Sequence, residues 1–238
     1  MKVLRIIHSL FFIFLTWTSW TIAATTALFF IPFSKVKTRP HQTAAHLWAR
    51  FAMAFSGSKV TVLGLENIPR DKAVVLAANH QSALDILIVL AFLPLNFRFV
   101  VSKEFFKLPL FGWGMRKAGY FSINRESPQA AYFTVKKITE IIKTGESVLI
   151  FPEGSRSRTG ELGEFKRGSL LPALKSGAPV IPIAISGSFN ALPYDTLFIK
   201  PHPIKLSVGK PVYMGSDAEY DRKFEEIRET IAKMLQNR

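Results

Sequence analysis

The chain has 238 residues, of which 48% are apolar and 20% are charged, so it is not a disordered chain and is long enough for one α/β domain with an attached segment. Lysine and arginine outnumber aspartate and glutamate by 31 to 17, and the resulting net charge of +14 requires an anionic partner such as a bilayer, a phosphorylated substrate or nucleic acid. Cysteine is absent, which excludes disulfides and thiolate sites.

The N-terminal region is uncharged and largely apolar over residues 9–34, with basic residues on both flanks. A run of this length can cross a bilayer core, which needs about 20 apolar residues. A second apolar stretch, residues 41–55, contains Arg50, which favours two helices lying partly in one leaflet over a simple crossing. A cleaved signal peptide is the alternative. We therefore expect a membrane anchor over residues 1–56 and an α/β domain over residues 57–238.

Beyond residue 56, short runs of β-branched and apolar residues predict strands, and the stretches between them predict helices. The strands are expected at residues 60–63, 74–77, 97–101, 148–151, 180–185 and 204–208, with Pro182 limiting the pairing of the fifth. The helices are expected at residues 84–93, 129–143, 169–176 and 217–236. The last has apolar residues at steps of four and three, which mark one buried face. This alternation predicts a mixed central sheet of six or seven strands flanked by helices.

The first motif, residues 79–85 (Asn-His-Gln-Ser-Ala-Leu-Asp), lies between a predicted buried strand and a predicted helix. Open α/β sheets place their sites at such strand ends. Across a strand-to-helix turn, Asp85 can fold back onto the imidazole of His80. A carboxylate on one ring nitrogen fixes the tautomer and stabilises the imidazolium, so His80 is a candidate general base for a hydroxyl. A helix-capping or other structural role is the alternative.

The second motif, residues 151–157 (Phe-Pro-Glu-Gly-Ser-Arg-Ser), also follows an apolar strand. Gly154 allows the backbone to turn sharply, and Ser155 and Arg156 supply hydrogen-bond donors. Arginine binds phosphate oxygens with two parallel hydrogen bonds, and a glycine-containing turn can present backbone N–H groups to an anion. The motif therefore favours an anion site, and a solvated basic loop is the alternative.

Together these motifs resemble the first and third signature blocks of the glycerolipid acyltransferases, and in particular of the 1-acylglycerol-3-phosphate acyltransferases. Residues 103–112 resemble the family's Lys-Glu-Leu stretch, residues 119–125 its second block and residues 180–185 its fourth. The similarity covers roughly residues 57–212, and an apolar anchor precedes it in the family as well. Ser155 stands where threonine is frequent and Phe105 where leucine is frequent.

The resemblance implies transfer of a fatty acyl group from acyl-CoA or acyl carrier protein to the sn-2 hydroxyl of 1-acylglycerol 3-phosphate (lysophosphatidic acid), making phosphatidic acid in phospholipid biosynthesis. It implies that His80 removes the hydroxyl proton and that Asp85 holds His80, with Ser82 as nucleophile the less favoured alternative. The implied substrate-binding residues are Lys103, Arg125, Glu153, Gly154, Ser155 and Arg156. The resemblance implies no cofactor, because the acyl donor is a substrate.

Other functions are compatible with parts of the sequence. The same chemistry could act on glycerol 3-phosphate or a lyso-aminolipid, and the chain could instead be a non-catalytic anionic-lipid-binding protein. A nucleic-acid binder is less favoured, because no zinc-finger spacing or ribonucleoprotein motif occurs. No metal site is expected, because the histidines lack a shared acidic partner at ligand spacing.

Location follows from the substrates that the resemblance implies. Acyl thioester carriers are cytosolic, whereas the acceptor and the product are bilayer lipids. We therefore expect the protein at an inner (cytoplasmic) membrane, with its catalytic domain on the cytosolic side and the phospholipid bilayer as a partner.

Overall fold

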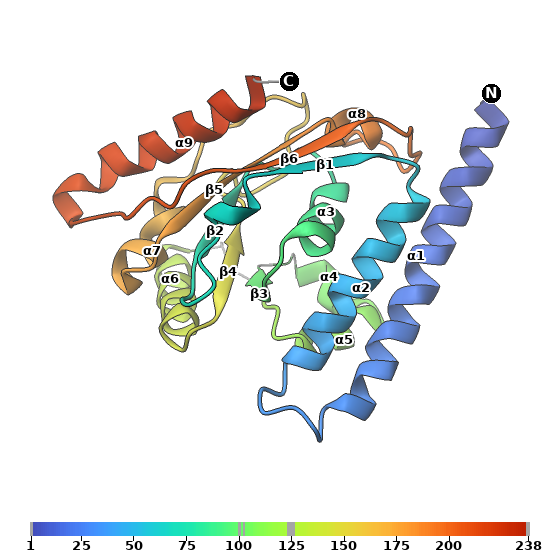
Figure 1. Ribbon diagram of the computed structural model, residues 1–238, viewed down its shortest axis with the longest axis horizontal. Helices are drawn as coiled ribbons and strands as arrows, with labels where there is room; N and C mark the ends of the chain where they lie inside the picture. The colour runs from blue at the N-terminus through green and yellow to red at the C-terminus, as the bar shows by residue number, and fades with distance from the viewer. Residues whose placement is uncertain (1, 100, 102, 123–126, 237–238) are drawn as a thin grey trace.

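The computed structural model of the chain describes residues 2–99, 101, 103–122 and 127–236. Two apolar helices, α1 (Lys2–Phe30) and α2 (Arg39–Phe55), lie side by side at one end of the molecule (Figure 1). Within the described residues, one sheet has six strands in the order β1-β6-β5-β2-β4-β3. Their bounds are β1 (Val60–Leu63), β2 (Val75–Ala78), β3 (Phe97–Phe99), β4 (Ser147–Ile150), β5 (Val180–Ser186) and β6 (Ile204–Val208).

The sheet is mixed, as the sequence predicts. β5 and β6 pair antiparallel, and the other neighbouring strands pair parallel. β5 pairs with strands on both of its sides, and Pro182 lies where the ladder to β6 is interrupted: the ladder begins at Ile183, and a separate bridge joins Val180 to Val212. The missing N–H of Pro182 thus falls in a gap of one ladder, and the strand remains central.

Helices connect and cover the strands. Their bounds are α3 (Leu84–Phe92), α4 (Lys103–Lys107), α5 (Phe111–Lys117), α6 (Pro128–Lys143), α7 (Leu171–Ser176), α8 (Ser188–Ala191) and α9 (Tyr220–Gln236), with single turns of 3₁₀ helix at Leu65–Asn67, Arg167–Leu170 and Asp217–Glu219. The four helices predicted in the α/β domain are present, the third and fourth with an initial 3₁₀ turn. The short helices α4, α5 and α8 were not predicted.

Side chains of the strands alternate between two apolar cores, because successive residues of a strand point to opposite faces. In β2, Leu76 and Ala78 join a core with α1, α2 and α3, whereas Val75 and Ala77 join a core with α6, α7 and α9. The buried face of α9 is the predicted one, since Tyr220, Phe224, Ile227 and Ile231 are all buried. Helices thus cover both faces of the sheet.

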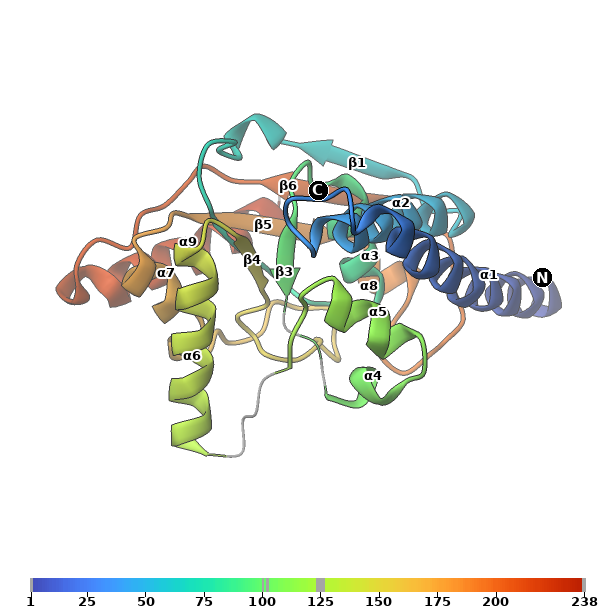
Figure 2. The ribbon, with the colours of Figure 1, turned by 90° about the horizontal axis from the view of Figure 1, so that it is seen from below.

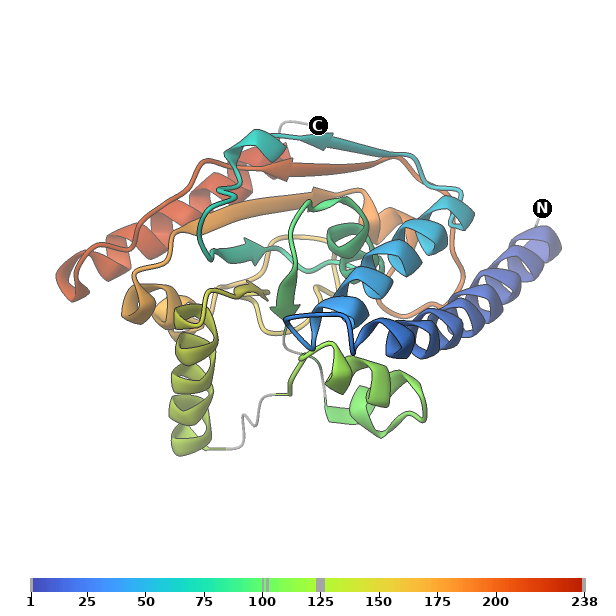
Figure 3. The same cartoon turned by 60° about the horizontal axis from the view of Figure 1, so that its bottom comes forward.

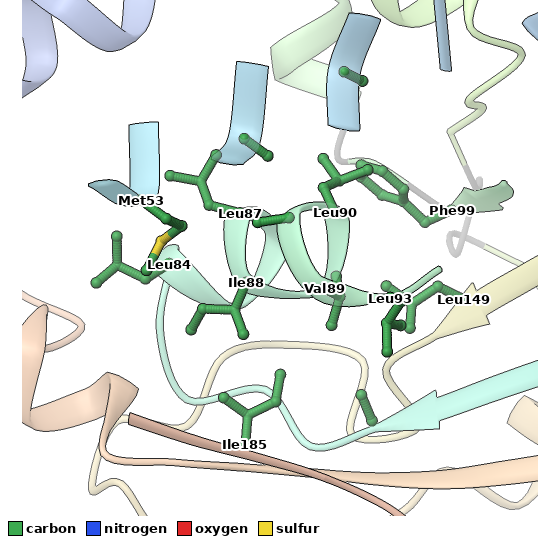
Figure 4. Close-up of a cluster of buried hydrophobic side chains, with 14 of the residues drawn as sticks. Met53, Leu84, Leu87, Ile88, Val89, Leu90, Leu93, Phe99, Leu149 and Ile185 are labelled. Carbon is green, nitrogen blue, oxygen red and sulfur yellow. The ribbon is translucent and has the colours of Figure 1, made fainter. Parts of the chain in front are cut away.

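Helix α3 is apolar on nearly every side because it lies between α2 and the sheet. Figure 4 shows Leu87 and Leu90 directed toward α2 and Ile88 directed toward Ile185 of β5. At its C-terminal end, Arg50 donates a hydrogen bond from Nε to the carbonyl of Ala91 at 2.8 Å. A positive charge at this end complements the helix dipole. At the other end, the acidic Asp85 in the first turn does the same. Both ends of α3 are therefore held.

Helix α1 packs one face along α2 (Figure 2). Phe12, Trp20 and Ala24 are buried at near-helical spacing, and the indole N–H of Trp48 donates to the carbonyl of Thr16 at 2.9 Å. The opposite face is exposed and apolar, and α1 is the one helix in the described part of the chain that is long and apolar enough to cross a membrane. The division into residues 1–56 and 57–238 stays a prediction, and α2 shares the core of α3.

Ile88→Ala should lower the free energy of unfolding by about 2–5 kcal/mol, because the side chain is fully buried between α3 and β5 and its loss leaves a cavity. Leu47→Ala on the exposed side of α2, where the side chain is 62% exposed, is the control. Denaturant-induced unfolding in detergent measures both. A similar loss in the two variants would contradict this account of the core.

Candidate active site

The first motif occupies the connection from β2 to α3 (Figure 3). The side chain of Asn79 continues the sheet beyond the end of β2: its Nδ2 donates to the carbonyl of Ile185 at 2.9 Å, and its Oδ1 accepts from the N–H of Ile185 at 2.7 Å. A side-chain amide can imitate a backbone peptide in this way. The start of the turn is thereby fixed to β5.

His80 and Asp85 meet across this turn. Nδ1 of His80 lies 2.9 Å from Oδ2 of Asp85. The same carboxylate oxygen accepts the backbone N–H groups of Gln81 at 2.7 Å and Ser82 at 2.8 Å. Asp85 is fully buried in the first turn of α3, where the helix dipole also favours a negative charge. The carboxylate therefore orders the turn and orients the imidazole at the same time.

The imidazole of His80 stacks on the ring of Phe151, with 4.0 Å between the ring centroids and 16° between the planes. Its side chain is 13% exposed. With Nδ1 directed at Asp85, Nε2 is the ring nitrogen that can accept a proton from a bound hydroxyl. Phe151 opens the second motif, so a residue of one motif sets the plane of the ring in the other.

The two motifs are also joined through the main chain of His80. Glu153 accepts the N–H of His80 at Oε1, 2.7 Å away, and the N–H of Gly163 at Oε2, 2.8 Å away. The carbonyl of His80 accepts the N–H of Ser157 at 2.7 Å. Burial raises the pKa of the Glu153 carboxyl above its usual range, while the two N–H groups act in the opposite direction. Both oxygens of Glu153 thus hold loops of the site.

The remaining residues of the second motif form a turn at the surface. Gly154 has φ +79°, a left-handed conformation that favours glycine, and its N–H donates to the carbonyl of Phe151 at 3.0 Å. Ser155 is exposed. The guanidinium of Arg156 lies over the ring of Tyr194, with Cζ 4.6 Å from the ring centroid. Arg156 is thus held by an aromatic ring outside either motif.

Two predicted binding residues cannot be compared with this geometry. Lys103 begins α4, but its side chain lies outside the described part of the structure, and Arg125 lies outside the described residues. Ser82 is fully buried, and its hydroxyl donates to the carbonyl of Leu192 at 2.8 Å. That contact gives Ser82 a structural task. Among the described residues, no group of three or more His, Asp or Glu could hold a metal ion.

A groove of about 1210 Å³ opens beside the pair and is lined by Gln81, residues 159–162 and parts of α8, β6 and α9. Nε2 of Gln81 donates to the carbonyl of Gly160 at 2.6 Å. This hydrogen bond connects the β2–α3 turn to the segment 159–162 that lines the groove. Neither His80 nor Asp85 lines the groove, so the pair lies beside it.

A family model described as acyltransferase matches residues 59–186, more than half of the chain and a stretch that contains both motifs. The chain belongs to the acyltransferase family. The resemblance seen in the sequence is therefore confirmed at the level of the family.

Individual relatives have more specific names. A chloroplastic 1-acyl-sn-glycerol-3-phosphate acyltransferase, BAT2, of Brassica napus is 35% identical over 87% of this chain and 59% of its own length. A 1-acyl-sn-glycerol-3-phosphate acyltransferase of Pseudomonas aeruginosa is 33% identical over 77% of this chain and 72% of its own length. The chain thus spans less than two thirds of the plant relatives it matches.

Similarity to a solved structure extends over the whole chain. The crystal structure of the 1-acyl-sn-glycerophosphate (LPA) acyltransferase PlsC from Thermotoga maritima has a TM-score of 0.85 and 26% sequence identity. It covers 100% of this chain and 98% of its own, so the likeness includes α1 and α2 as well as the sheet. The mixed α/β fold expected from the family is confirmed.

Glu153→Gln should lower the free energy of unfolding by about 1–3 kcal/mol at neutral pH, because a glutamine amide has one acceptor oxygen and leaves one of the two N–H groups without a partner. The pKa of Glu153 is raised in the folded chain, so protonation stabilises the fold. Wild type should therefore gain stability relative to the variant as the pH falls from neutral toward the usual glutamate range. Denaturant unfolding at neutral and mildly acidic pH measures both effects, and a difference independent of pH would contradict the raised pKa.

Proposed function

We propose that this chain transfers a fatty acyl group from an acyl thioester to the sn-2 hydroxyl of 1-acylglycerol 3-phosphate and so makes phosphatidic acid. The observation that carries the proposal is the 2.9 Å contact between His80 Nδ1 and Asp85 Oδ2, on a turn held by two further backbone hydrogen bonds. The names of the Brassica, Pseudomonas and Thermotoga proteins support the choice of acceptor.

The chemistry follows from the orientation of the imidazole. Nε2 of His80 takes the proton of the acceptor hydroxyl as that oxygen attacks the thioester carbonyl carbon. Asp85 holds the tautomer with a proton on Nδ1 and stabilises the imidazolium that forms. When the tetrahedral intermediate collapses, the carbon–sulfur bond breaks and the departing thiolate takes the proton from His80. An ester and a free thiol result, and the protein forms no covalent bond.

The phosphate of the acceptor requires cationic partners near the base. Arg156 is the candidate for which the structure gives a position, since Ser157 next to it is hydrogen-bonded to His80. Gly154 and Ser155 form the turn beside it and can supply backbone or hydroxyl donors. Glu153 supports the site indirectly, because its carboxylate oxygens accept the N–H groups of His80 and Gly163. Lys103 and Arg125 stay predictions for the same phosphate.

The bilayer is the source of the acceptor, and α1 is the proposed point of contact. Leu10 and Phe14 are each more than half exposed on α1, whereas the ring of Phe11 also meets Phe55 of α2. Because the other face packs along α2, burying the exposed face in one leaflet would leave the contacts with α2 intact. This exposure supports a helix pair lying in one leaflet. The proposed catalytic domain lies on the cytosolic side of an inner membrane, because that is where the acyl thioester carriers are.

An assay of full-length protein in detergent tests the function directly. Labelled acyl-CoA and acyl carrier protein thioesters are supplied in turn with lysophosphatidic acid, glycerol 3-phosphate or a lyso-aminolipid. Phosphatidic acid is the expected product, and the preferred thioester identifies the donor. Product from another acceptor alone would reassign the substrate. Binding of anionic lipid without any thioester-dependent product would favour the non-catalytic alternative.

His80→Ala should lower kcat by about 10²–10⁴-fold, the range for loss of a general base, while the protein stays folded. His202→Ala is the matched control, because the His202 ring is hydrogen-bonded to the side chain of Asn190 and lies outside the His80–Asp85 pair. Near-normal turnover of folded His80→Ala would overturn the mechanism.

Asp85→Asn should also lower kcat by roughly 10²–10⁴-fold. The amide oxygen can still accept the N–H groups of Gln81 and Ser82, so the turn should persist, but the amide neither stabilises the imidazolium nor enforces the tautomer of His80. Turnover and thermal unfolding, measured together, separate loss of catalysis from loss of fold. Equal activity of Asn and Asp at this position would remove the carboxylate from the mechanism.

Full-length protein should stay with membranes in high salt, because burial of apolar side chains is not screened by ions. The double variant Leu10→Ser, Phe14→Ser removes two side chains from the exposed face of α1 and should shift protein to the soluble fraction. Sedimentation with vesicles after salt washing measures the partition. Release of the unmodified protein by salt alone would show an electrostatic attachment and contradict the role of α1.

A further inference from the structure

Two arginines gather at the ring of Tyr194, a residue of the connection between α8 and β6. Cζ of Arg156 lies 4.6 Å from the ring centroid and Cζ of Arg158 lies 5.2 Å from it. Within the described part of the chain, neither guanidinium forms an ion pair with a carboxylate. Arg156 is half-buried and Arg158 is exposed. Two positive charges therefore share one aromatic partner.

The fold fixes this cluster relative to the His80 base. Ser157, between the two arginines, donates its N–H to the carbonyl of His80 at 2.7 Å. On the other side, the hydroxyl of Ser82 donates to the carbonyl of Leu192, two residues before Tyr194. Both the arginines and the ring are thus tied to the turn that carries His80. Their distance from the base is set by these two hydrogen bonds.

An aromatic ring holds a guanidinium differently from a carboxylate. The electron-rich face of the ring attracts the cation but leaves its charge uncompensated. A carboxylate at the same place would compete with an anionic ligand for the guanidinium N–H groups. Two like charges at one ring repel each other, and an anion that contacts both relieves that repulsion. The arrangement of Tyr194, Arg156 and Arg158 therefore suits a ligand with more than one negative charge.

We infer that Tyr194 positions Arg156 and Arg158 as a joint binding site for a phosphate monoester, with Arg158 as a second ligand beside Arg156. A phosphate monoester carries nearly two negative charges at neutral pH and presents three acceptor oxygens. Each guanidinium can bind such a group with two parallel hydrogen bonds. The inference rests on the proposed function, in which the acceptor is phosphorylated.

This site distinguishes the acceptor from the lipids around it. The phosphodiester headgroups of a bilayer carry one negative charge on the phosphate, whereas 1-acylglycerol 3-phosphate carries a monoester. Binding through two guanidinium groups favours the monoester. The 3′-phosphate of an acyl-CoA donor is also a monoester, so the experiment must separate the acceptor from the donor.

Substitutions of Tyr194 test its positioning role. Tyr194→Leu should raise the KM for 1-acylglycerol 3-phosphate by about 2- to 10-fold, because it removes a cation–π contact. Tyr194→Phe keeps the ring and should stay within about twofold of wild type. The KM for acyl-CoA should not change in either variant. A Phe variant as impaired as the Leu variant would overturn the role of the ring.

Substitutions of Arg158 test the second ligand. Arg158→Gln should raise the acceptor KM by about tenfold, the loss expected for a charge-assisted hydrogen bond. Lys175→Gln removes an exposed positive charge from α7 and is the matched control. A larger effect of Arg158→Gln on the KM for acyl-CoA than for 3′-dephospho-acyl-CoA would assign the site to the donor and overturn the inference.

A binding measurement separates this inference from the proposed function. Calorimetry in detergent compares wild type, Tyr194→Leu and Arg158→Gln for 1-acylglycerol 3-phosphate and its phosphate methyl ester, which is a diester. Wild type should prefer the monoester, and both variants should lose the preference. That result upholds the site even if no product forms in the transfer assay. Active wild type with the preference unchanged in both variants upholds the function and overturns the site.

Discussion

Three hydrogen bonds converge on one oxygen of Asp85, from the His80 imidazole and from the backbone N–H groups of Gln81 and Ser82. Burying a carboxylate this deeply costs desolvation free energy unless hydrogen-bond donors compensate it. Removing one donor therefore leaves part of that desolvation penalty uncompensated. The path of the chain from β2 into α3 is therefore set by the hydrogen bonds that the Asp85 carboxylate accepts. His80 points where it does because its imidazole is one of the donors that this carboxylate requires.

Although the chain is strongly basic, acidic and aromatic side chains hold the site around that carboxylate. The acidic side chains of the site, Asp85 and Glu153, accept backbone N–H groups, and Asp85 also orients His80. Aromatic rings hold the groups that the proposed function needs as a base and as cations: Phe151 stacks on the imidazole, and Tyr194 lies against two guanidinium groups. A ring restricts orientation without neutralising its partner. In the proposed function, the site is thus ordered before the phosphorylated substrate binds.

Local patterns in the sequence could be predicted, and contacts between distant segments could not. The strands follow from short runs of β-branched and apolar residues, α9 from apolar residues at steps of four and three, and the His80–Asp85 contact from a five-residue spacing across a turn. Helix α5 escaped prediction because it contains two glycines; one of them, Gly114, leaves room for Trp20 of α1, which a side chain would meet at 2.9 Å. The link from Tyr194 to the second motif likewise has no local signature, since the ring and the arginines meet only in the folded chain.

The strand order also bears on how the chain is made. β1 lies at an edge of the sheet and pairs with β6, so Val60 is in register with Ile204. The first strand to leave the ribosome must therefore wait for almost the last segment before it has a partner, and such long-range closure slows folding. Meanwhile α1 has already emerged and is apolar on its outer face. Early binding of α1 to the membrane would keep the nascent chain at the bilayer while the sheet forms. The loop of Tyr194 is completed in the same step.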